Sequence, residues 1–298
     1  MSALLAIDSG QTGIKVRLPD GAPRTFPGIR TNQRLLPQLA EVVHESALGG
    51  AGPLELAIGT TGLTKLEANP TELLELCRAD GVERVALAHD SVTSFLGAMG
   101  YQTGVVVAAG TGVVTLGVGP TAVSRVDGWG NLIGDAGSGF WIGRAGLDAV
   151  MRAFDGRGQA TALTAFAEAE FSALDNAYIE LQTDPGHVRR IGSFAKYVSD
   201  LAATDPVCAR ICEQAGAELA TSVAAAAKNV GLDVPQVALL GGVFRSPAIR
   251  EACVAALRMR WPGFQPAEPL GDILDGAAAL ASLPAGHPLA AQVLVAAV

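Results

Sequence analysis

The sequence predicts an α/β fold of two lobes that close over a cleft, and three observations carry this prediction. Short β-branched runs of strand length alternate along the chain with segments of helical spacing. Two strand–turn–strand units with polar, glycine-bearing turns lie about a hundred residues apart, which indicates two halves built on one plan. The chain has 298 residues, of which 49% are hydrophobic, so it can bury one large or two ordinary domains.

The first strand–turn–strand unit opens the chain, where an apolar run ends in the polar turn DSGQTG at residues 8–13. Further on, Pro70 marks a helix start because proline fits the first helical turn. The elements expected in the first hundred residues are strands at 2–7 and 14–18, a helix at 32–48, a strand at 54–58, a helix at 71–80, a strand at 84–88 and a short helix from 90 to 100.

The second unit consists of two β-branched runs around the turn Gly110-Thr111-Gly112. Beyond it the pattern is almost entirely helical from 147 to 230, with breaks at Gly156, Pro185 and Pro206. The elements expected here are strands at 105–109 and 113–118, a helix at 140–154, a strand at 237–240, a turn at 241–244, and helices at 247–258 and 272–283.

Charge and cysteine content exclude several classes of protein. With 21 Lys and Arg against 29 Asp and Glu, the net charge of −8 argues against a nucleic-acid partner or an anionic membrane surface. Residues 91–124 carry no charge, but seven glycines and Pro120 would break a lipid-facing helix, so we expect no membrane span. The four cysteines have neither zinc-ligand spacing nor a disulfide pattern, and the N-terminus lacks the basic region of a signal peptide, so we expect a cytoplasmic protein.

Both glycine-bearing turns suit a phosphate group. Glycines leave backbone N–H groups bare and allow a phosphate oxygen to approach closely, so Gly110, Thr111 and Gly112 form one candidate nucleotide site. In the first turn the candidates are Ser9, Gly10, Gln11 and Thr12. Asp8, at the end of a buried strand, would hold Mg²⁺ through water; its alternative reading is an ordinary Asx-turn.

Asp90 also stands where a buried strand ends, at the edge where open α/β sheets place ligands. It is the candidate base that accepts a proton from a sugar hydroxyl during phosphoryl transfer. The alternative is that Asp90 is only the N-cap of the helix that follows. We interpret His89 as a strand-end residue and not as a catalyst.

A second glycine cluster, GWGNLIGDAGSG at residues 128–139, suits a sugar. Its candidates are Gly128, Trp129, Gly130 and the carboxylate of Asp135, which would accept hydrogen bonds from sugar hydroxyls. Trp129 could instead belong to the core, as most tryptophans do, although its flanking glycines suggest that something approaches its backbone. The chain contains neither a P-loop nor a dinucleotide-binding fingerprint.

On these residues the chain resembles the actin-like ATPase and sugar kinase superfamily, in the branch of N-acetylglucosamine kinases, BadF/BcrA-type ATPases and actinobacterial glucosamine kinases. The matching motifs are DSGQTGIKV, AAGTG, LLGGVFRS, DGAAALA and, most specifically, GWGNLIGDAGSGFWIG. The resemblance implies a two-lobed actin/hexokinase-like (ribonuclease H-like) fold with a central nucleotide and sugar cleft. It implies that Asp90 is the base, that Asn32 joins the sugar contacts, and that Gly241 and Gly242 touch ATP.

The expected lobes are residues 1–100 with 284–298, and residues 101–283. Two departures from the family pattern bear on the substrate. N-acetylglucosamine kinases carry Ser-Asn after the second turn and Glu after Gly-Asp, whereas this chain has Val113-Val114 and Ala136. An acetamide buried without partners costs about 1–3 kcal/mol, roughly 5- to 150-fold in affinity. A free amino sugar is therefore favoured, with Asp135 as the candidate partner of its ammonium.

The expected function is ATP- and Mg²⁺-dependent phosphorylation of the 6-hydroxyl of D-glucosamine. Three alternatives stay open: an N-acetylglucosamine kinase, a BadF-type ATPase that activates a partner enzyme through an iron–sulfur cluster, and a sugar-responsive binding protein without catalysis. Because Cys208 and Cys212 lie inside a helix-like stretch, they are interpreted as core residues and not as cluster ligands. The sequence does not fix the oligomeric state, and a homodimer is one candidate assembly.

Overall fold

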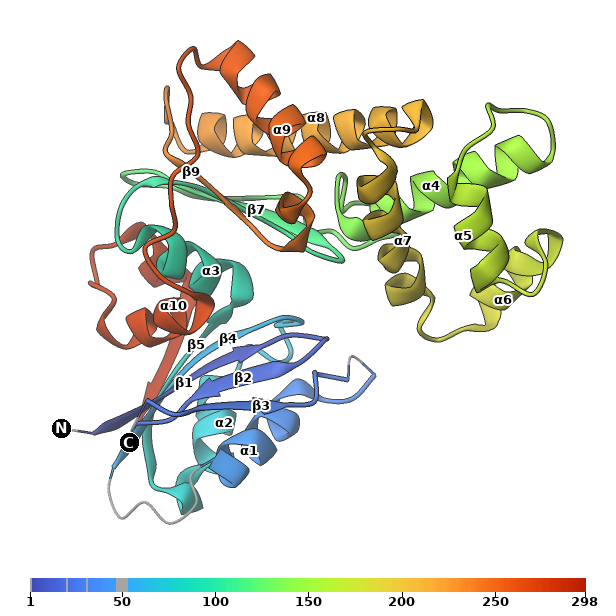
Figure 1. Cartoon of the computed structure of the whole chain (residues 1–298). Coiled ribbons are helices and arrows are strands. Elements are labelled where there is room, and N and C mark those ends of the chain that lie inside the picture. Colours follow the sequence, from blue (N-terminus) through green and yellow to red (C-terminus); the bar gives the residue numbers. More distant parts are fainter. Residues whose placement is uncertain (1, 20, 31, 47–52) are drawn as a thin grey trace. The chain divides into compact units, whose positions relative to one another are not determined.

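The computed structural model describes residues 2–19, 21–30, 32–46 and 53–298, and Figure 1 traces the α/β chain through them. The chain divides into two compact units. The first unit comprises Met1–Gly104, Val118–Val123 and Glu268–Val298, and the second comprises Val105–Gly117 and Ser124–Ala267. Each unit carries one of the two glycine-bearing turns.

The first unit is built on a six-stranded sheet with the order β10-β5-β4-β1-β2-β3. Its three central strands are parallel and mostly buried, as expected for apolar runs. Antiparallel strands flank them on both sides. The bounds are β1 (Ala3–Ser9), β2 (Ile14–Arg17), β3 (Pro23–Phe26), β4 (Leu54–Thr60), β5 (Val82–His89) and β10 (Val293–Ala297).

In the first unit, helices α3 and α10 pack closely because glycines, which have no side chain, lie where the two helices cross. A methyl group on Gly97 of α3 would overlap the Asp272 carbonyl, and one on Gly276 of α10 would overlap the Thr93 carbonyl. The helices are α1 (Leu35–Ser46), α2 (Pro70–Leu76), α3 (Asp90–Met99) and α10 (Ile273–Ala279). Since α10 packs on α3, this part of the chain belongs to the first unit, whereas the expected lobes put residues 268–283 in the second.

The second unit holds most of a four-stranded sheet with the order β8-β7-β6-β9, and helices fill the rest. Helices α4 and α7 lie so close that a methyl group on Gly143 would overlap the Ile191 carbonyl. The bounds are β6 (Gly104–Ala109), β7 (Val113–Val118), β8 (Val123–Val126), α4 (Gly139–Phe154), α5 (Leu163–Glu170), α6 (Ala177–Thr183), α7 (His187–Leu201), α8 (Pro206–Asn229), β9 (Val237–Leu240) and α9 (Pro247–Arg260).

Most expected elements are confirmed, and the differences have physical reasons. Strands β3, β8 and β10 were not expected; β3 opens with a proline and is largely exposed, so it shows no alternation. Helix α10 ends at Ala279 and continues only as a short 3-10 turn, not as a helix to 283. Residues 47–48 of the expected first helix lie outside the described residues. The uncharged stretch 91–124 folds into α3, β6 and β7, and no helix in the described ranges is long and apolar enough to span a membrane.

Candidate functional site

The first unit brings Asp8 and Asp90 to one end of its sheet. Asp8 pairs with Lys15 on β2 and with Gly59 on β4, and residues at one register direct their side chains to the same face. That face is the one covered by α3, since a methyl group on Gly59 would overlap Thr93. Asp90 is the first residue of α3, so two carboxylates meet where β1 and β5 end.

Negative charge accumulates at this end of the sheet. Burial, followed by the charge of Asp90 and a smaller effect of Asp272, raises the pKa of Asp8 to about 6, although Lys15 opposes the shift. A carboxyl group whose pKa rises in this way lacks sufficient positive charge nearby. A cation bound beside Asp8 and Asp90 would therefore be stabilised by their negative charge.

Asp90 is not the cap of its helix. The N-cap is His89, whose Nδ1 accepts a hydrogen bond from the Ser91 N–H at 3.2 Å, so the N-cap alternative for Asp90 is wrong. Asp90 Oδ1 lies 2.7 Å from the same nitrogen, but the contact lacks hydrogen-bond geometry, and this buried oxygen has no hydrogen-bond partner. A buried carboxylate oxygen without a partner is unusual and marks a candidate functional group.

The first turn is closed by the Gly10 N–H, which donates to the Gly13 carbonyl at 3.1 Å. Gln11 and Thr12 are exposed at its tip, whereas the Ser9 hydroxyl is buried without a hydrogen-bond partner. No pattern in the sequence indicated a role for Gly28. A methyl group there would overlap the Gln11 carbonyl, so this glycine lets its part of the chain lie against the turn. That chain continues to Asn32, which is exposed ahead of α1.

The second unit brings together the other predicted nucleotide-binding residues, which are the Gly110–Gly112 turn and the pair Gly241 and Gly242. The Gly110–Gly112 turn is closed by the Gly110 N–H, which donates to the Gly112 carbonyl at 2.8 Å, and Thr111 is exposed. Strand β9 runs parallel to β6 and ends beside it. Gly241, with φ of 99°, follows β9 so closely that a methyl group on it would overlap the Ala109 carbonyl, and Gly242 comes next. Both glycine pairs thus stand at one end of the sheet.

The predicted sugar loop adjoins the same turn. Gly139 and Phe140, at the start of α4, donate backbone hydrogen bonds to the carbonyls of Gly110 and Thr111 at 2.7 and 3.0 Å. Asp135 is buried, and a methyl group on Gly112 would lie 2.8 Å from its Oδ2. Glycine at 112 therefore makes room for the Asp135 carboxylate.

Burial, then the charge of Asp127, raises the pKa of Asp135, while the backbone amides of Val113 and Gly130 and the charge of Arg125 lower it. Trp129 is 60% exposed, so its core alternative is wrong. Sequence reasoning missed Asp127, Arg125 and Gly192. A methyl group added to Gly192 of α7 would lie 3.4 Å from the Thr111 methyl carbon, so this glycine packs close to the second turn. An Asp or Arg outside a known motif offers no signal in the sequence.

The donor set of the first unit fits a magnesium ion bound through water. Within the described ranges, no group of three or more His, Cys, Asp or Glu could hold a metal by itself. Mg²⁺ prefers carboxylates, keeps several waters and is commonly completed by substrate phosphates. Two neighbouring carboxylates, Asp8 with its raised pKa and Asp90 with an oxygen that lacks a hydrogen-bond partner, match that chemistry.

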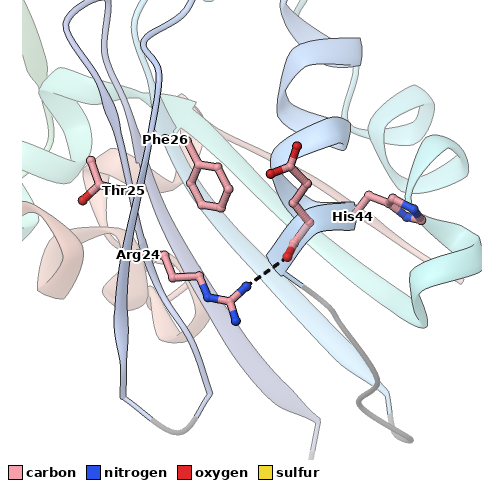
Figure 2. Close-up of a pocket in the computed structure, with 5 residues that line it drawn as sticks. Arg24, Thr25, Phe26 and His44 are labelled. Atoms are coloured by element: carbon pink, nitrogen blue, oxygen red, sulfur yellow. Dashed lines mark hydrogen bonds between the residues drawn. The ribbon is translucent and has the colours of Figure 1, made fainter.

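A pocket of about 410 Å³ lies between β3 and α1 and is separate from these residues (Figure 2). Arg24, Thr25, Phe26, His44 and Glu45 line it, and Arg24 donates a hydrogen bond to the Glu45 carbonyl at 3.0 Å. It contains none of the predicted site residues, so we assign it no part in phosphate or sugar binding.

The fold is that of the actin-like sugar kinases. A ROK family glucokinase from Streptomyces griseus, solved with glucose and AMPPNP, matches with a TM-score of 0.52, 16% identity, and coverage of 94% of this chain and 98% of that chain. A candidate N-acetylglucosamine kinase from Chromobacterium violaceum matches with a TM-score of 0.70, 28% identity, and coverage of 93% and 98%.

Within that class the chain belongs to the BadF/BadG/BcrA/BcrD ATPase family, whose pattern matches residues 4–281. It is 27% identical over 272 residues to an N-acetylmuramic acid/N-acetylglucosamine kinase from Clostridium acetobutylicum, covering 83% of this chain and 87% of the relative. A shorter match of 69 residues, 46% identical, links it to an N-acetyl-D-glucosamine kinase from Dictyostelium discoideum; it covers 23% of this chain and 22% of the relative.

Proposed function

We propose that the chain is an ATP-dependent amino sugar kinase that phosphorylates the 6-hydroxyl of D-glucosamine. The observation that carries the proposal is the Asp90 carboxylate, whose buried Oδ1 has no hydrogen-bond partner and which stands beside Asp8 at the end of a parallel sheet. The family description as ATPases supports ATP as the nucleotide, and the relatives named as kinases of amino sugars support the substrate class.

In the proposed reaction, Asp90 accepts the proton of the sugar 6-hydroxyl as that oxygen forms a bond to the γ-phosphorus. The bond between the γ-phosphorus and the bridging oxygen breaks, and ADP leaves with the bond's electron pair. Asp90 then releases the proton to solvent. The Asp90 side chain is 29% exposed, which supports this role because a sugar hydroxyl can reach the carboxylate.

Backbone N–H groups of the two turns would hold the phosphates, with the hydroxyls of Thr12 and Thr111 exposed beside them. Gly241 and Gly242 would lie on the adenosine side. Bound Mg²⁺, held by Asp8 through water, would neutralise phosphate charge. Phosphoryl transfer depends mainly on such positioning and charge stabilisation, so these groups suffice.

The sugar loop supports a free amino sugar over an acetylated one. Val113 is buried and Val114 lies against Gly128 of the sugar loop, with 3.2 Å between the Val114 Cβ and an added methyl group. Side chains of this kind offer an acetamide no hydrogen bond, which would cost about 1–3 kcal/mol. Asp135 would accept hydrogen bonds from sugar hydroxyls and from the ammonium group.

An N-acetylglucosamine kinase is the second candidate, favoured by the names of the relatives. The activator function known for BadF-type proteins finds less support. All four cysteine thiols are buried, and burial raises the pKa of Cys212 to about 12 and that of Cys208 to about 11. Neutral, buried thiols are poor ligands for an iron–sulfur cluster.

A coupled assay of ADP release tests the proposal with glucosamine, N-acetylglucosamine, glucose and N-acetylmannosamine. We expect sugar-dependent ADP release with the highest kcat/KM for glucosamine. A higher kcat/KM for N-acetylglucosamine would select the second candidate. ADP release without dependence on any sugar, together with bound iron and visible absorbance, would select the activator.

A further inference from the structure

The sugar loop and Asp127, the residue that precedes it, contain the two non-glycine residues with positive φ in the described part of the chain. Asp127 has φ of 58° and Asp135 has φ of 61°. This left-handed conformation disfavours residues with a Cβ, although Asp tolerates it better than most. Such strain persists only where surrounding contacts hold it in place, and it concentrates at binding sites.

The Asp127 carboxylate supplies those contacts. Its Oδ1 accepts hydrogen bonds from the Gly128 N–H and the Asp135 N–H, both at 2.7 Å, and its Oδ2 accepts one from the Ala136 N–H at 3.0 Å. The loop thus begins and ends on one side chain. A methyl group on Gly134 would lie 2.6 Å from the same Oδ1, so glycine there lets the backbone reach the carboxylate.

Arg125, on β8 two residues before Asp127, holds the same segment through different atoms. Its Nη2 donates a hydrogen bond to the Gly128 carbonyl, and its guanidinium lies 5.1 Å from the centre of the Trp129 ring, which is cation–π geometry. Gly128 is therefore fixed at both its N–H and its carbonyl. The exposed Trp129 indole is oriented by the guanidinium that covers it.

We infer that Asp127 is the positioning residue of the sugar site, with Arg125 in support: it fixes the backbone that presents Trp129 and Asp135 to the hexosamine. This inference rests on the proposed function. Asp135 is held from two sides, by Asp127 at its backbone N–H and by the backbone amides of Val113 and Gly130 at its carboxylate. The residue that would contact the sugar is thereby fixed relative to the phosphate turn of the same unit.

The variant Asp127→Gly removes the carboxylate without backbone strain, because glycine adopts a φ of 58° freely. It loses the three hydrogen bonds and the charge that raises the pKa of Asp135. We expect the KM for glucosamine to rise about 10- to 100-fold, while the KM for ATP stays within about twofold. A variant that only loosened the fold would impair both substrates together. An unchanged KM for glucosamine would overturn the inference.

The variant Asp127→Asn keeps the shape and one acceptor oxygen, so its KM for glucosamine should lie between those of the unsubstituted protein and Asp127→Gly. If Asp127→Gly does not fold, Asp127→Asn decides: a rise of about 3- to 10-fold supports the inference, and no rise contradicts it. Asp148→Asn is the matched control, since Asp148 is an exposed partner of Arg152 on α4. If the unsubstituted protein phosphorylates no amino sugar, the proposed function has failed and not the positioning role.

Discussion

The two glycine-bearing turns have the same plan but differ in how many of the nearby polar groups are paired within the protein. At the second turn most polar groups are paired within the protein: carbonyls of Gly110 and Thr111 accept hydrogen bonds from the start of α4, and Asp127 accepts three from the sugar loop, although the pKa of Asp135 is raised and Thr115 Oγ1 is buried without a hydrogen-bond partner. Beside the first turn fewer are paired. Asp90 Oδ1 and Ser9 Oγ are buried without hydrogen-bond partners, and Asp8 has a raised pKa.

This difference indicates two kinds of preorganisation. The second turn is held in place by hydrogen bonds made within the protein, which suits the recognition of a hexosamine ring and of phosphate oxygens. The first turn holds unsatisfied negative charge that a cation and a proton can satisfy. This unpaired charge lowers the stability of the folded protein, which is a common cost of groups that carry out chemistry.

The largest effect is expected at Asp90, beside the first turn. The variant Asp90→Asn keeps the shape of the side chain but cannot accept the hydroxyl proton, so we expect kcat to fall by about 10²–10⁴ with little change in ATP affinity. Steady-state kinetics and nucleotide titration check the two quantities separately. Near-normal turnover would remove Asp90 from its role and leave the first turn as a structural hairpin.

A smaller effect is expected in the second unit, at the two glycines that follow β9. Gly241→Ala places a methyl group on the Ala109 carbonyl at a φ of 99°, so we expect a loss of about 2–4 kcal/mol in the free energy of unfolding. Gly242→Ala is the matched control because a methyl group there has nothing within 4 Å, and we expect a change within about 0.5 kcal/mol. Denaturant unfolding measures both. Equal stability of the two variants would mean that the ends of β9 and β6 do not meet as described.

The smallest expected effect concerns pH and Asp8. Because the folded protein raises the pKa of Asp8 from 3.8 to about 6, its contribution to stability is fully present below about pH 3.8 and is lost as the pH rises through about 6. Asp8→Asn should therefore raise the Tm of the ligand-free protein at pH 7.5 by about 2–4 °C, discounted for the partial exposure of the group. The difference should disappear near pH 4. A lower Tm at pH 7.5 would show that Asp8 is already compensated without a ligand.

Much of the fold could be predicted from the sequence because its strands are buried β-branched runs and its turns carry glycines. Strand β9 has the expected bounds, and α4 begins one residue before its expected start. The edge strands β3 and β8 could not be predicted, since a strand that buries little needs no apolar alternation. The association of α10 with α3 depends on Gly97 and Gly276, whose pairing no local pattern reveals.

The candidate site divides in the same way. Asp8, Asp90 and the two turns could be found because each follows a strand and combines polar side chains with glycine. Asp127 could not, because its role depends on the return of the chain to Ala136 and on a positive φ, neither of which a side-chain pattern encodes. The mistaken N-cap alternative for Asp90 has a similar cause, since the preference for Asp at this position ignored the neighbouring His89 ring.

The most direct test of the central claim is the identity of the product formed from ATP and glucosamine, determined by mass spectrometry and by ³¹P nuclear magnetic resonance. The account predicts one phosphate per sugar, esterified at the 6-hydroxyl, and one ADP per sugar phosphate. Release of ADP without a phosphorylated sugar, or a phosphate at the anomeric hydroxyl, would contradict it.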